Sequence, residues 1–342
     1  MRVLVVNPGS SSLKVSLLRD GDEVPDDGGP YDAIGVRFVH GGPRTAAVRL
    51  DESVLDELAE VSDLAPLHNP PALDAARDLL GRHPGVPVVA CFDTAFHATM
   101  PPAAATYALP REWNERYGLR RYGFHGLSHS YAARRAARLL RRPVEELRVV
   151  TCHLGGGASL CAVRGGRSVD TTMGMTPMEG LVMQTRSGSV DPGLVFHLLS
   201  AGVPADELER VLDRESGLAG LTGTSGDLRE VRAAAAAGSE DAVTGLAVYV
   251  HALVRGVGAM AAAAGGIDAL VFTGGVGEHA PEVRRDAVRG LAFLGLGVDE
   301  LLNEEASGDV DVSAAGSTVA TLVVTAREDL EIERQVRAVL EG

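Results

Sequence analysis

The chain has 342 residues and a formal net charge of −14, with 45% hydrophobic and 23% charged residues. Its length suggests two domains, and its composition is ordinary for a soluble globular protein. The negative charge argues against non-specific binding to nucleic acid and against an anionic membrane surface. A site for an anionic ligand must therefore concentrate its few cations locally, which makes arginines in glycine-rich segments informative.

The first residues, MRVLVVNPG, contain one basic residue and a short apolar run, and they do not fit a signal peptide. No apolar run approaches the roughly 20 residues that cross a bilayer. Cys91, Cys152 and Cys161 lie in apolar strand-like runs without a CxxC pair, which argues against a zinc ribbon or a disulfide framework. We therefore expect a cytoplasmic protein.

Two segments far apart in the chain share one pattern. Residues 3–18 read VLVVNPGSSSLKVSLL and residues 149–163 read VVTCHLGGGASLCAV. Each predicts a strand, a tight loop of small residues, and a second strand that pairs back onto the first. Two such hairpins suggest a duplicated domain. The alternative is a chance similarity between two hairpins.

Strand-like and helix-like stretches alternate after each hairpin. In chain order we predict a buried strand over 86–93, an amphipathic helix over 128–142, an Ala-rich helix over 239–264, a strand over 268–275, a strand over 318–324 and a C-terminal helix from about Arg327. Ser239 would cap the Ala-rich helix and Gly265-Gly266 would end it. Hairpins combined with βαβ units predict α/β domains with mixed sheets, and a cleft between two such halves is a natural ligand site.

Glycine-rich loops follow three of the predicted strands, at residues 7–12, 155–157 and 274–278. Backbone N–H groups without side chains can converge on a phosphate in such loops. Most glycine turns are only turns, but three at strand ends favour a nucleotide.

The common nucleotide and metal motifs are absent or misplaced. There is no GxxxxGK[ST], which excludes a P-loop. Residues 256–261, GVGAMA, resemble half of a dinucleotide motif but lie in a helical pattern, where close helix packing explains them better. His125 and His129 have the spacing of a zinc helix, but HGLSH lacks the glutamate of HExxH.

Several charged or polar side chains lie in apolar or glycine-rich segments: Arg37 in GVRFVHGG, His68 in APLHNPP, His125 in YGFHGLSH and Arg186 in MQTRSGSVDP. A solvated helix face does not explain them. For any one of them, a structural ion pair that holds a loop is the alternative. Asp93 ends a buried strand and is either a metal ligand or a cap.

Nine strings, in order, resemble blocks of the acetate kinase family, a branch of the sugar kinase/Hsp70/actin superfamily. They are NPGSSSLK, RFVHGG, PLHNPP, FDTAFH, RYGFHGLSH, HLGGGAS, MGMTPMEGLVMQTRSGSVDPG, FTGGVGEH and AREDLEIE, and they span residues 3 to about 334.

The resemblance implies two duplicated ribonuclease-H-like (actin-like ATPase) domains, with the active site in the cleft between them. The first would span residues 1–148 plus 328–342, and the second, nucleotide-binding domain residues 149–327. It also implies a homodimer and the reversible, in-line conversion of ATP and acetate into ADP and acetyl phosphate with Mg²⁺ or Mn²⁺, and it implies neither a nucleic-acid nor a membrane partner.

The resemblance also implies roles for individual residues. Arg37 and Arg186 match the arginines that hold the carboxylate and the transferring phosphoryl group. His125 matches the histidine that hydrogen-bonds that group, and His68 a supporting histidine. Asp93 matches the acid that orients the metal and its water, and Asn7 and Glu328 match residues that bind the metal. The nucleotide side comprises Ser10, Ser12, Lys14, His153, Gly155, Gly156, Gly157, Asp227, Leu228, Arg229, Gly274, Gly275, Val276, Gly277 and His279.

Val39, Leu67, Phe124 and Pro177 match the apolar pocket for the acetate methyl group. Propionate-preferring relatives have a smaller residue at the position of Val39, so the resemblance favours acetate. One methylene in a pocket changes binding by only about 1–3 kcal/mol, and a propionate or butyrate kinase therefore stays an alternative. An actin- or Hsp70-like ATPase without a small-acid substrate is a second alternative, against which Arg37, Arg186 and Val39 count.

Three features depart from the family pattern. The chain is short for the family, and most of the missing length falls between Leu18 and Gly35. Gly156 stands where the family has an asparagine beside the phosphate site, and His279 stands where it has an asparagine on the nucleotide side.

Overall fold

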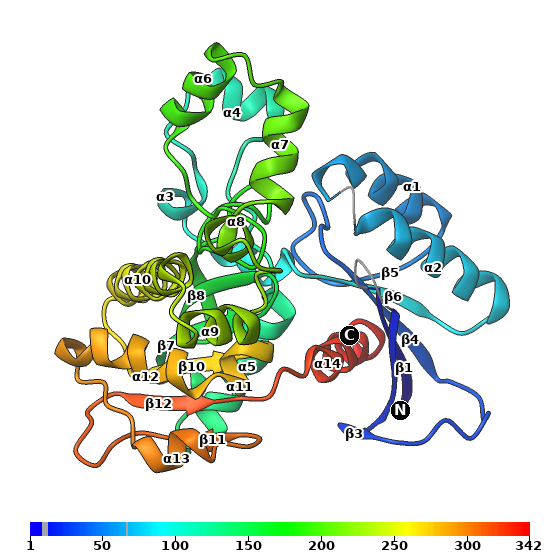
Figure 1. Ribbon diagram of the computed structural model, residues 1–342. Helices are drawn as coiled ribbons and strands as arrows, with labels where there is room; N and C mark the ends of the chain where they lie inside the picture. The colour runs from blue at the N-terminus through cyan, green and yellow to red at the C-terminus, as the bar shows by residue number, and fades with distance from the viewer. Residues whose placement is uncertain (9–12, 66–67) are drawn as a thin grey trace. The chain divides into compact units, whose positions relative to one another are not determined.

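A computed structural model describes residues 1–8, 13–65 and 68–342 of the chain (Figure 1). The chain forms two compact units. The first comprises Met1–Thr99, Tyr122–Tyr131 and Arg327–Gly342, and the second Met100–Arg121 and Ala132–Ala326. Residues 100–121 and 132–148 thus pack with the second unit, although the sequence assigns them to the first domain. Compact units and duplicated domains are different divisions of a chain, and the predicted domain boundaries stay a prediction.

Each unit is built on a six-stranded mixed sheet. The strands of the first sheet are β1 (Arg2–Pro8), β2 (Leu13–Arg19), β3 (Asp22–Glu23), β4 (Ala33–Phe38), β5 (Val48–Arg49) and β6 (Val88–Phe92). Those of the second are β7 (Arg148–Leu154), β8 (Ala158–Arg164), β9 (Arg167–Thr171), β10 (Ala269–Thr273), β11 (Val310–Asp311) and β12 (Ala320–Val323).

The two sheets have the same topology. Their strand orders, β3-β2-β1-β4-β6-β5 and β9-β8-β7-β10-β12-β11, match position by position. In both, the first strand pairs antiparallel with the second and parallel with the fourth, as β1 does with β2 and β4 and as β7 does with β8 and β10. This confirms the predicted fold class and the duplication suggested by the two hairpins.

Helices cover both faces of the first sheet. Helices α1 (Glu52–Glu60) and α2 (Asn69–Arg82) bury Leu55, Leu58 and Leu73 against one face. Helix α14 (Glu328–Glu341) buries Ile332 and Val336 against the other, together with the first turn of α5 (Gly126–Leu140). The C-terminal helix therefore packs on the N-terminal sheet (Figure 1).

The second unit carries the remaining α-helices. They are α3 (Pro102–Ala105), α4 (Arg111–Tyr117), α6 (Pro192–Ser200), α7 (Ala205–Arg214), α8 (Gly217–Thr222), α9 (Leu228–Ala236), α10 (Glu240–Ala264), α11 (Gly274–His279), α12 (Pro281–Gly290) and α13 (Glu300–Glu304). Helix α10 packs against β7 and β8. As predicted, the Ser239 side chain caps it and Gly265, in a left-handed conformation, ends it. Among the described residues, α10 is the one helix that is long and apolar enough to cross a bilayer. The prediction that no apolar run approaches that length was therefore wrong for this helix.

One predicted detail differs in the structure, and another agrees with it. The glycines that were expected to form a turn after the strand over 268–275 instead open helix α11. Gly274 makes the sharp entry with a φ of +79°, and its N–H donates to Glu278 Oε1 at 3.0 Å, which holds the first turn of the helix closed. In the first sheet, the edge strand β3 has 2 residues where its counterpart β9 has 5, which agrees with the missing length between Leu18 and Gly35.

Candidate active site

The carboxyl ends of three neighbouring strands and the start of one helix bring four predicted residues together in the first unit. Asn7 is the last residue but one of β1, Arg37 is the last residue but one of β4, and Asp93 follows β6. Because β1, β4 and β6 run parallel, these positions share one edge of the sheet. Glu328 reaches the same edge from the first residue of α14.

Arg37 is the centre of this set, which we call the Arg37 cluster (Asn7, Arg37, Asp93 and Glu328). Its Nη2 and Nε donate to the two Asp93 oxygens at 2.6 and 3.2 Å. Its Nη1 donates to Asn7 Oδ1 and to Glu328 Oε2, both at 3.0 Å, and Asn7 Nδ2 donates to Glu328 Oε2 at 2.8 Å. Two carboxylates thus share one guanidinium, so the ionised cluster has a net charge of −1.

Burial dominates the electrostatics of Asp93, whose side chain is 1% exposed. Loss of solvation raises the pKa of Asp93 to about 6, and the charges and hydrogen bonds of Arg37 oppose that rise. Glu328 adds a second negative charge that raises the same pKa. The two neighbouring carboxylates also raise the pKa of Arg37, which therefore stays charged.

His125 lies next to the cluster in an unusual backbone conformation. Its φ is +56°, which is uncommon outside glycine. Its backbone N–H donates to the Asp93 carboxylate, and the N–H of Gly126 donates to the Asp93 carbonyl at 3.0 Å. A Cβ at position 126 would collide with that carbonyl oxygen. The turn before α5 is therefore fixed against Asp93, and such strain is typical of functional positions.

The remaining predicted residues of the first unit lie nearby or at its surface. His68 immediately precedes α2, and Val39 follows β4. The ring of His40, next to Val39, lies 5.7 Å from that of Phe124. Lys14 is exposed on β2, opposite Asn7. Three predicted residues lie outside the described residues: Ser10, Ser12 and Leu67.

In the second unit, glycine turns line a cavity of about 350 Å³. Its lining includes eight of the predicted nucleotide-side residues: Gly155, Gly156, Asp227, Leu228, Arg229, Gly275, Val276 and His279. The turn 155–157 follows β7, and α11 follows β10, so parallel strands β7 and β10 bring these segments to one sheet edge. His153 on β7 pairs with Thr273 on β10. Gly157, Gly274 and Gly277 belong to the same two segments but are not among the lining residues.

Asp227 and Arg229 have a local structural role in this cavity wall. Asp227 caps α9 by accepting the N–H of Arg229 at 2.9 Å, and it also accepts the Nε and Nη2 of Arg229 at 2.9 and 2.6 Å. These hydrogen bonds lower the pKa of Asp227 to about 2. The pair is electrically neutral and lies where the chain enters α9.

Arg186 lies in an irregular segment of the second unit, 21% exposed. Its Nε donates to Asp213 Oδ1 at 3.1 Å, and its Nη1 donates to the carbonyl of Pro177 at 3.4 Å. Arg186 is therefore linked to the segment that carries a predicted residue of the methyl pocket. Sequence reasoning missed Asp213, since one acid on an amphipathic helix gives no signal.

A second missed set holds that segment in place. Arg121 Nη1 donates to the carbonyls of Thr172 and Met173, both at 3.1 Å, and its Nη2 donates to Glu179 Oε1 at 2.6 Å. The Tyr107 hydroxyl donates to Glu179 Oε2 at 2.7 Å and accepts the N–H of Met175 at 2.9 Å. Arg121 and Glu179 lie within motifs that the resemblance matched, but only the structure shows that they meet.

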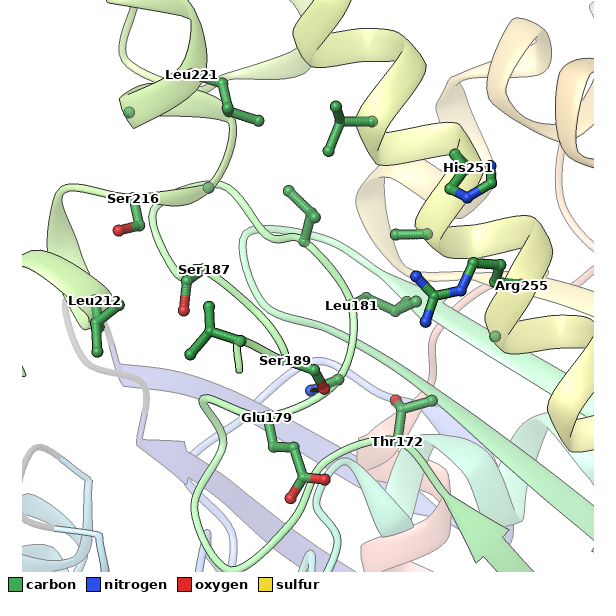
Figure 2. Close-up of a pocket in the computed structure, with 18 of the residues that line it drawn as sticks. Thr172, Glu179, Leu181, Ser187, Ser189, Leu212, Ser216, Leu221, His251 and Arg255 are labelled. Carbon is green, nitrogen blue, oxygen red and sulfur yellow. Dashed lines mark hydrogen bonds between the residues drawn. The ribbon is translucent and has the colours of Figure 1, made fainter. Parts of the chain in front are cut away.

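A larger cavity of about 960 Å³ lies elsewhere in the second unit and contains none of the predicted residues. Figure 2 shows Leu181, Leu212 and Leu221 on its wall with His251 and Arg255 from α10. Its lining is mainly apolar. Among the described residues, no cluster of three or more His, Cys, Asp or Glu side chains is arranged to hold a metal ion.

The chain is similar to known proteins in both sequence and structure. The model of the acetokinase family matches residues 20–334. The acetate kinase of Clavibacter sepedonicus is 52% identical over 310 residues, which is 90% of this chain and 78% of that protein. Two crystal structures each cover 99% of both chains. One is acetate kinase from Porphyromonas gingivalis (TM-score 0.92, 35% identity), and the other is a propionate kinase from Francisella tularensis (TM-score 0.88, 32% identity).

Proposed function

Because the chain belongs to the acetokinase family, we propose that it transfers a phosphoryl group reversibly between ATP and acetate, giving ADP and acetyl phosphate. An acetate oxygen forms the new bond to the γ-phosphorus, the bond from that phosphorus to the β–γ bridging oxygen breaks, and ADP leaves with the electron pair. No proton is transferred. The observation that carries the proposal is the buried Arg37 guanidinium, because the approach of two anions needs fixed positive charge and β4 holds this cation at the carboxyl edge of the sheet.

We assign the predicted roles on this basis. Arg37 and Arg186 hold the carboxylate and the transferring phosphoryl group, since a guanidinium can contact both anions through paired N–H groups. His125 donates a hydrogen bond to that phosphoryl group, and His68 supports it. Arg186 belongs to the second unit, and Arg37, His68 and His125 belong to the first.

The Arg37 cluster also fits a divalent cation. Its carboxylate and amide oxygens are the donors that Mg²⁺ and Mn²⁺ prefer. Its two carboxylates exceed its one guanidinium by one negative charge, which a cation would neutralise. Glu328 and Asn7 would hold the metal and Asp93 would orient its water. When bound, the metal would neutralise charge on the phosphate oxygens.

Val39, Phe124 and Pro177 match the apolar residues of the methyl pocket in acetate-preferring members of the family, which supports acetate over longer acids. The Phe124 carbonyl accepts a hydrogen bond from Nε2 of buried His97 at 3.0 Å, which fixes the backbone at Phe124. A propionate kinase stays the second candidate, since the solved propionate kinase resembles the chain almost as closely as the solved acetate kinase does.

We also propose a cytoplasmic homodimer that binds neither nucleic acid nor membrane. The net charge of −14 supports the last two points. Large exposed apolar side chains on α6 and α10 support an interface with a second copy: Leu194, Phe196, Leu199, Val243 and Val248. Light scattering after chromatography tests this, with Phe196→Asp expected to give monomers. A wild-type monomer at micromolar concentration would contradict it.

A hydroxamate assay with ATP, Mg²⁺ and formate, acetate, propionate or butyrate tests the activity. We expect acetate to give the highest kcat/KM. A preference for propionate or butyrate would overturn the acetate assignment while leaving the family intact. ATP hydrolysis that acetate does not affect, with no acyl phosphate formed, would favour the ATPase alternative.

A further inference from the structure

The carboxylate of Glu278 joins two segments that leave the second sheet at the same edge. Strands β10 and β12 are parallel neighbours, and at the end of the pair the Val324 N–H donates to the Phe272 carbonyl at 2.9 Å. Beyond this point β10 leads into α11, whereas β12 leads through a short connection to α14. Glu278 Oε1 accepts the N–H of Gly274 and the N–H of Ala326, both at 3.0 Å. One oxygen therefore holds the two diverging segments together.

A buried arginine fixes the backbone from which this carboxylate projects. Arg284 is 1% exposed, and its Nη1 donates to the carbonyls of Gly277 and Glu278 at 2.9 and 2.7 Å. Its Nε and Nη2 donate to the side-chain oxygen and the carbonyl of Asn303, on α13, at 2.7 and 2.6 Å. The last turn of α11 is thus tied to α13. Glu278 therefore starts from a fixed point and anchors the connection after β12.

The two segments that Glu278 joins carry different parts of the candidate site. Helix α11 contributes three residues to the lining of the 350 Å³ cavity. Ala326 is the last residue of the second unit, and the chain enters the first unit at Arg327. The next residue, Glu328, accepts a hydrogen bond from Arg37 Nη1 at 3.0 Å. The backbone that Glu278 holds thus lies two positions before a proposed metal-binding carboxylate.

Local capping of α11 explains only half of this arrangement. The hydrogen bond with Gly274 closes the first turn of the helix, but the one with Ala326 spans 48 residues and adds nothing to the helix. Hydrogen bonds to an ionised carboxylate are stronger than those between neutral groups. Glu278 therefore favours one position of Ala326, in addition to the helix start.

We propose that Glu278 is a positioning residue: through the backbone of Ala326 it orients Glu328 toward the divalent cation, and through Gly274 it sets the cavity wall that receives the nucleotide. This rests on the proposed function, because it assumes that Glu328 holds the metal of a metal–nucleotide complex. Glu278 acts through other residues. Its loss should therefore reduce what the metal adds to nucleotide binding, without abolishing that binding.

Calorimetry with ADP, in the presence and absence of Mn²⁺, tests this without relying on turnover. The measured quantity is the factor by which Mn²⁺ tightens ADP binding. We expect Glu278→Ala to lower this factor about 10-fold or more, as replacement of a residue that orients a metal ligand typically does. In the hydroxamate assay kcat should fall by up to about 10²-fold, because the reacting groups are misplaced, while KM for acetate should stay as in the wild type.

Three further variants separate position from charge and from folding. Glu278→Gln keeps an acceptor oxygen in the same place and should retain most of the Mn²⁺ factor. Glu278→Asp keeps the charge but is one methylene shorter, so it should lose one of the two N–H contacts and part of the factor, even if Glu278→Ala does not fold. Glu300→Ala removes a carboxylate of α13 that is 59% exposed, and as the matched control it should leave both measurements unchanged.

A double variant with Glu328→Gln distinguishes this role from helix capping alone. If Glu278 acts through Glu328, Glu278→Ala should have no further effect on the Mn²⁺ factor once Glu328 is replaced. An equal effect in both backgrounds would overturn the proposal. So would a wild-type factor in Glu278→Ala and Glu278→Asp, or a loss in Glu278→Gln as large as in Glu278→Ala. A wild type that binds ADP and Mn²⁺ but forms no acetyl phosphate would instead contradict the proposed function, and the calorimetry would still test Glu278.

Discussion

The substitution Asp93→Asn should abolish a pH dependence that burial imposes on the first unit. Asp93 is 1% exposed, and burial raises its pKa from the ordinary 3.8 to about 6 despite the contact with Arg37. The folded protein therefore binds a proton at Asp93 more tightly than the unfolded chain does. Stability linked to this group is fully present below about pH 4 and is lost as the pH rises through about 6.

The size of this stability change follows from the shift in the pKa of Asp93. A change of about 2 pKa units corresponds to about 3 kcal/mol, at about 1.4 kcal/mol for each unit. Between pH 4 and pH 7 the free energy of unfolding of the first unit should fall by about 2 kcal/mol more in the wild type than in Asp93→Asn, because a carboxyl with a pKa of 3.8 is already more than half ionised at pH 4 in the unfolded chain. The amide is neutral throughout, so the variant lacks this titration.

Hydrogen exchange of peptides from β4 and β6 measures the opening of this unit, compared between the two proteins at each pH. Tryptophan fluorescence is unsuitable, because the single tryptophan, Trp113, belongs to the second unit. Asp78→Asn removes an exposed carboxylate of the first unit and should leave the slope as in the wild type. Equal slopes in wild type and Asp93→Asn would refute the reasoning. If the stability of the wild type instead rises with pH relative to the variant, then Arg37 lowers the pKa of Asp93 by more than burial raises it.

Three further changes test the assigned roles. Arg186→Ala should lower kcat by about 10²-fold or more. The melting temperature should change little, because the partner of Arg186, Asp213, is 21% exposed. Near-normal turnover with a large fall in melting temperature would show that Arg186 forms a structural ion pair. Val39→Ala should move the preference from acetate toward propionate in the hydroxamate assay, and an unchanged ratio would remove Val39 from the pocket. Glu179→Gln should loosen the segment that carries Pro177 and raise KM for acetate severalfold while KM for ATP stays constant. Glu115→Gln, in an exposed ion pair, is its control, and equal effects on both KM values would contradict a positioning role.

The sequence by itself determined the local and repeated features of this protein. The two hairpins, the buried strand that ends at Asp93 and the helix from Ser239 to Gly265 follow from alternation, capping and glycine signals within a few residues. The ordered motifs determined the family and named Arg37, Asp93 and Glu328, although 291 residues separate the two ends of the Arg37–Glu328 contact.

Only the tertiary structure decided how those side chains share their charges. The sequence left open whether Arg37 binds a ligand or forms a structural ion pair, and it named no partner for it. The parallel strands β4 and β6 place Arg37 against Asp93, and the return of α14 places it against Glu328. The hydrogen bond from Ala326 to Glu278 and the network of Arg121, Tyr107 and Glu179 depend on loop packing, which has no period in the sequence. Hydrogen bonds and burial between distant residues depend on where the backbone places them, and a pattern of neighbouring residues does not encode that position.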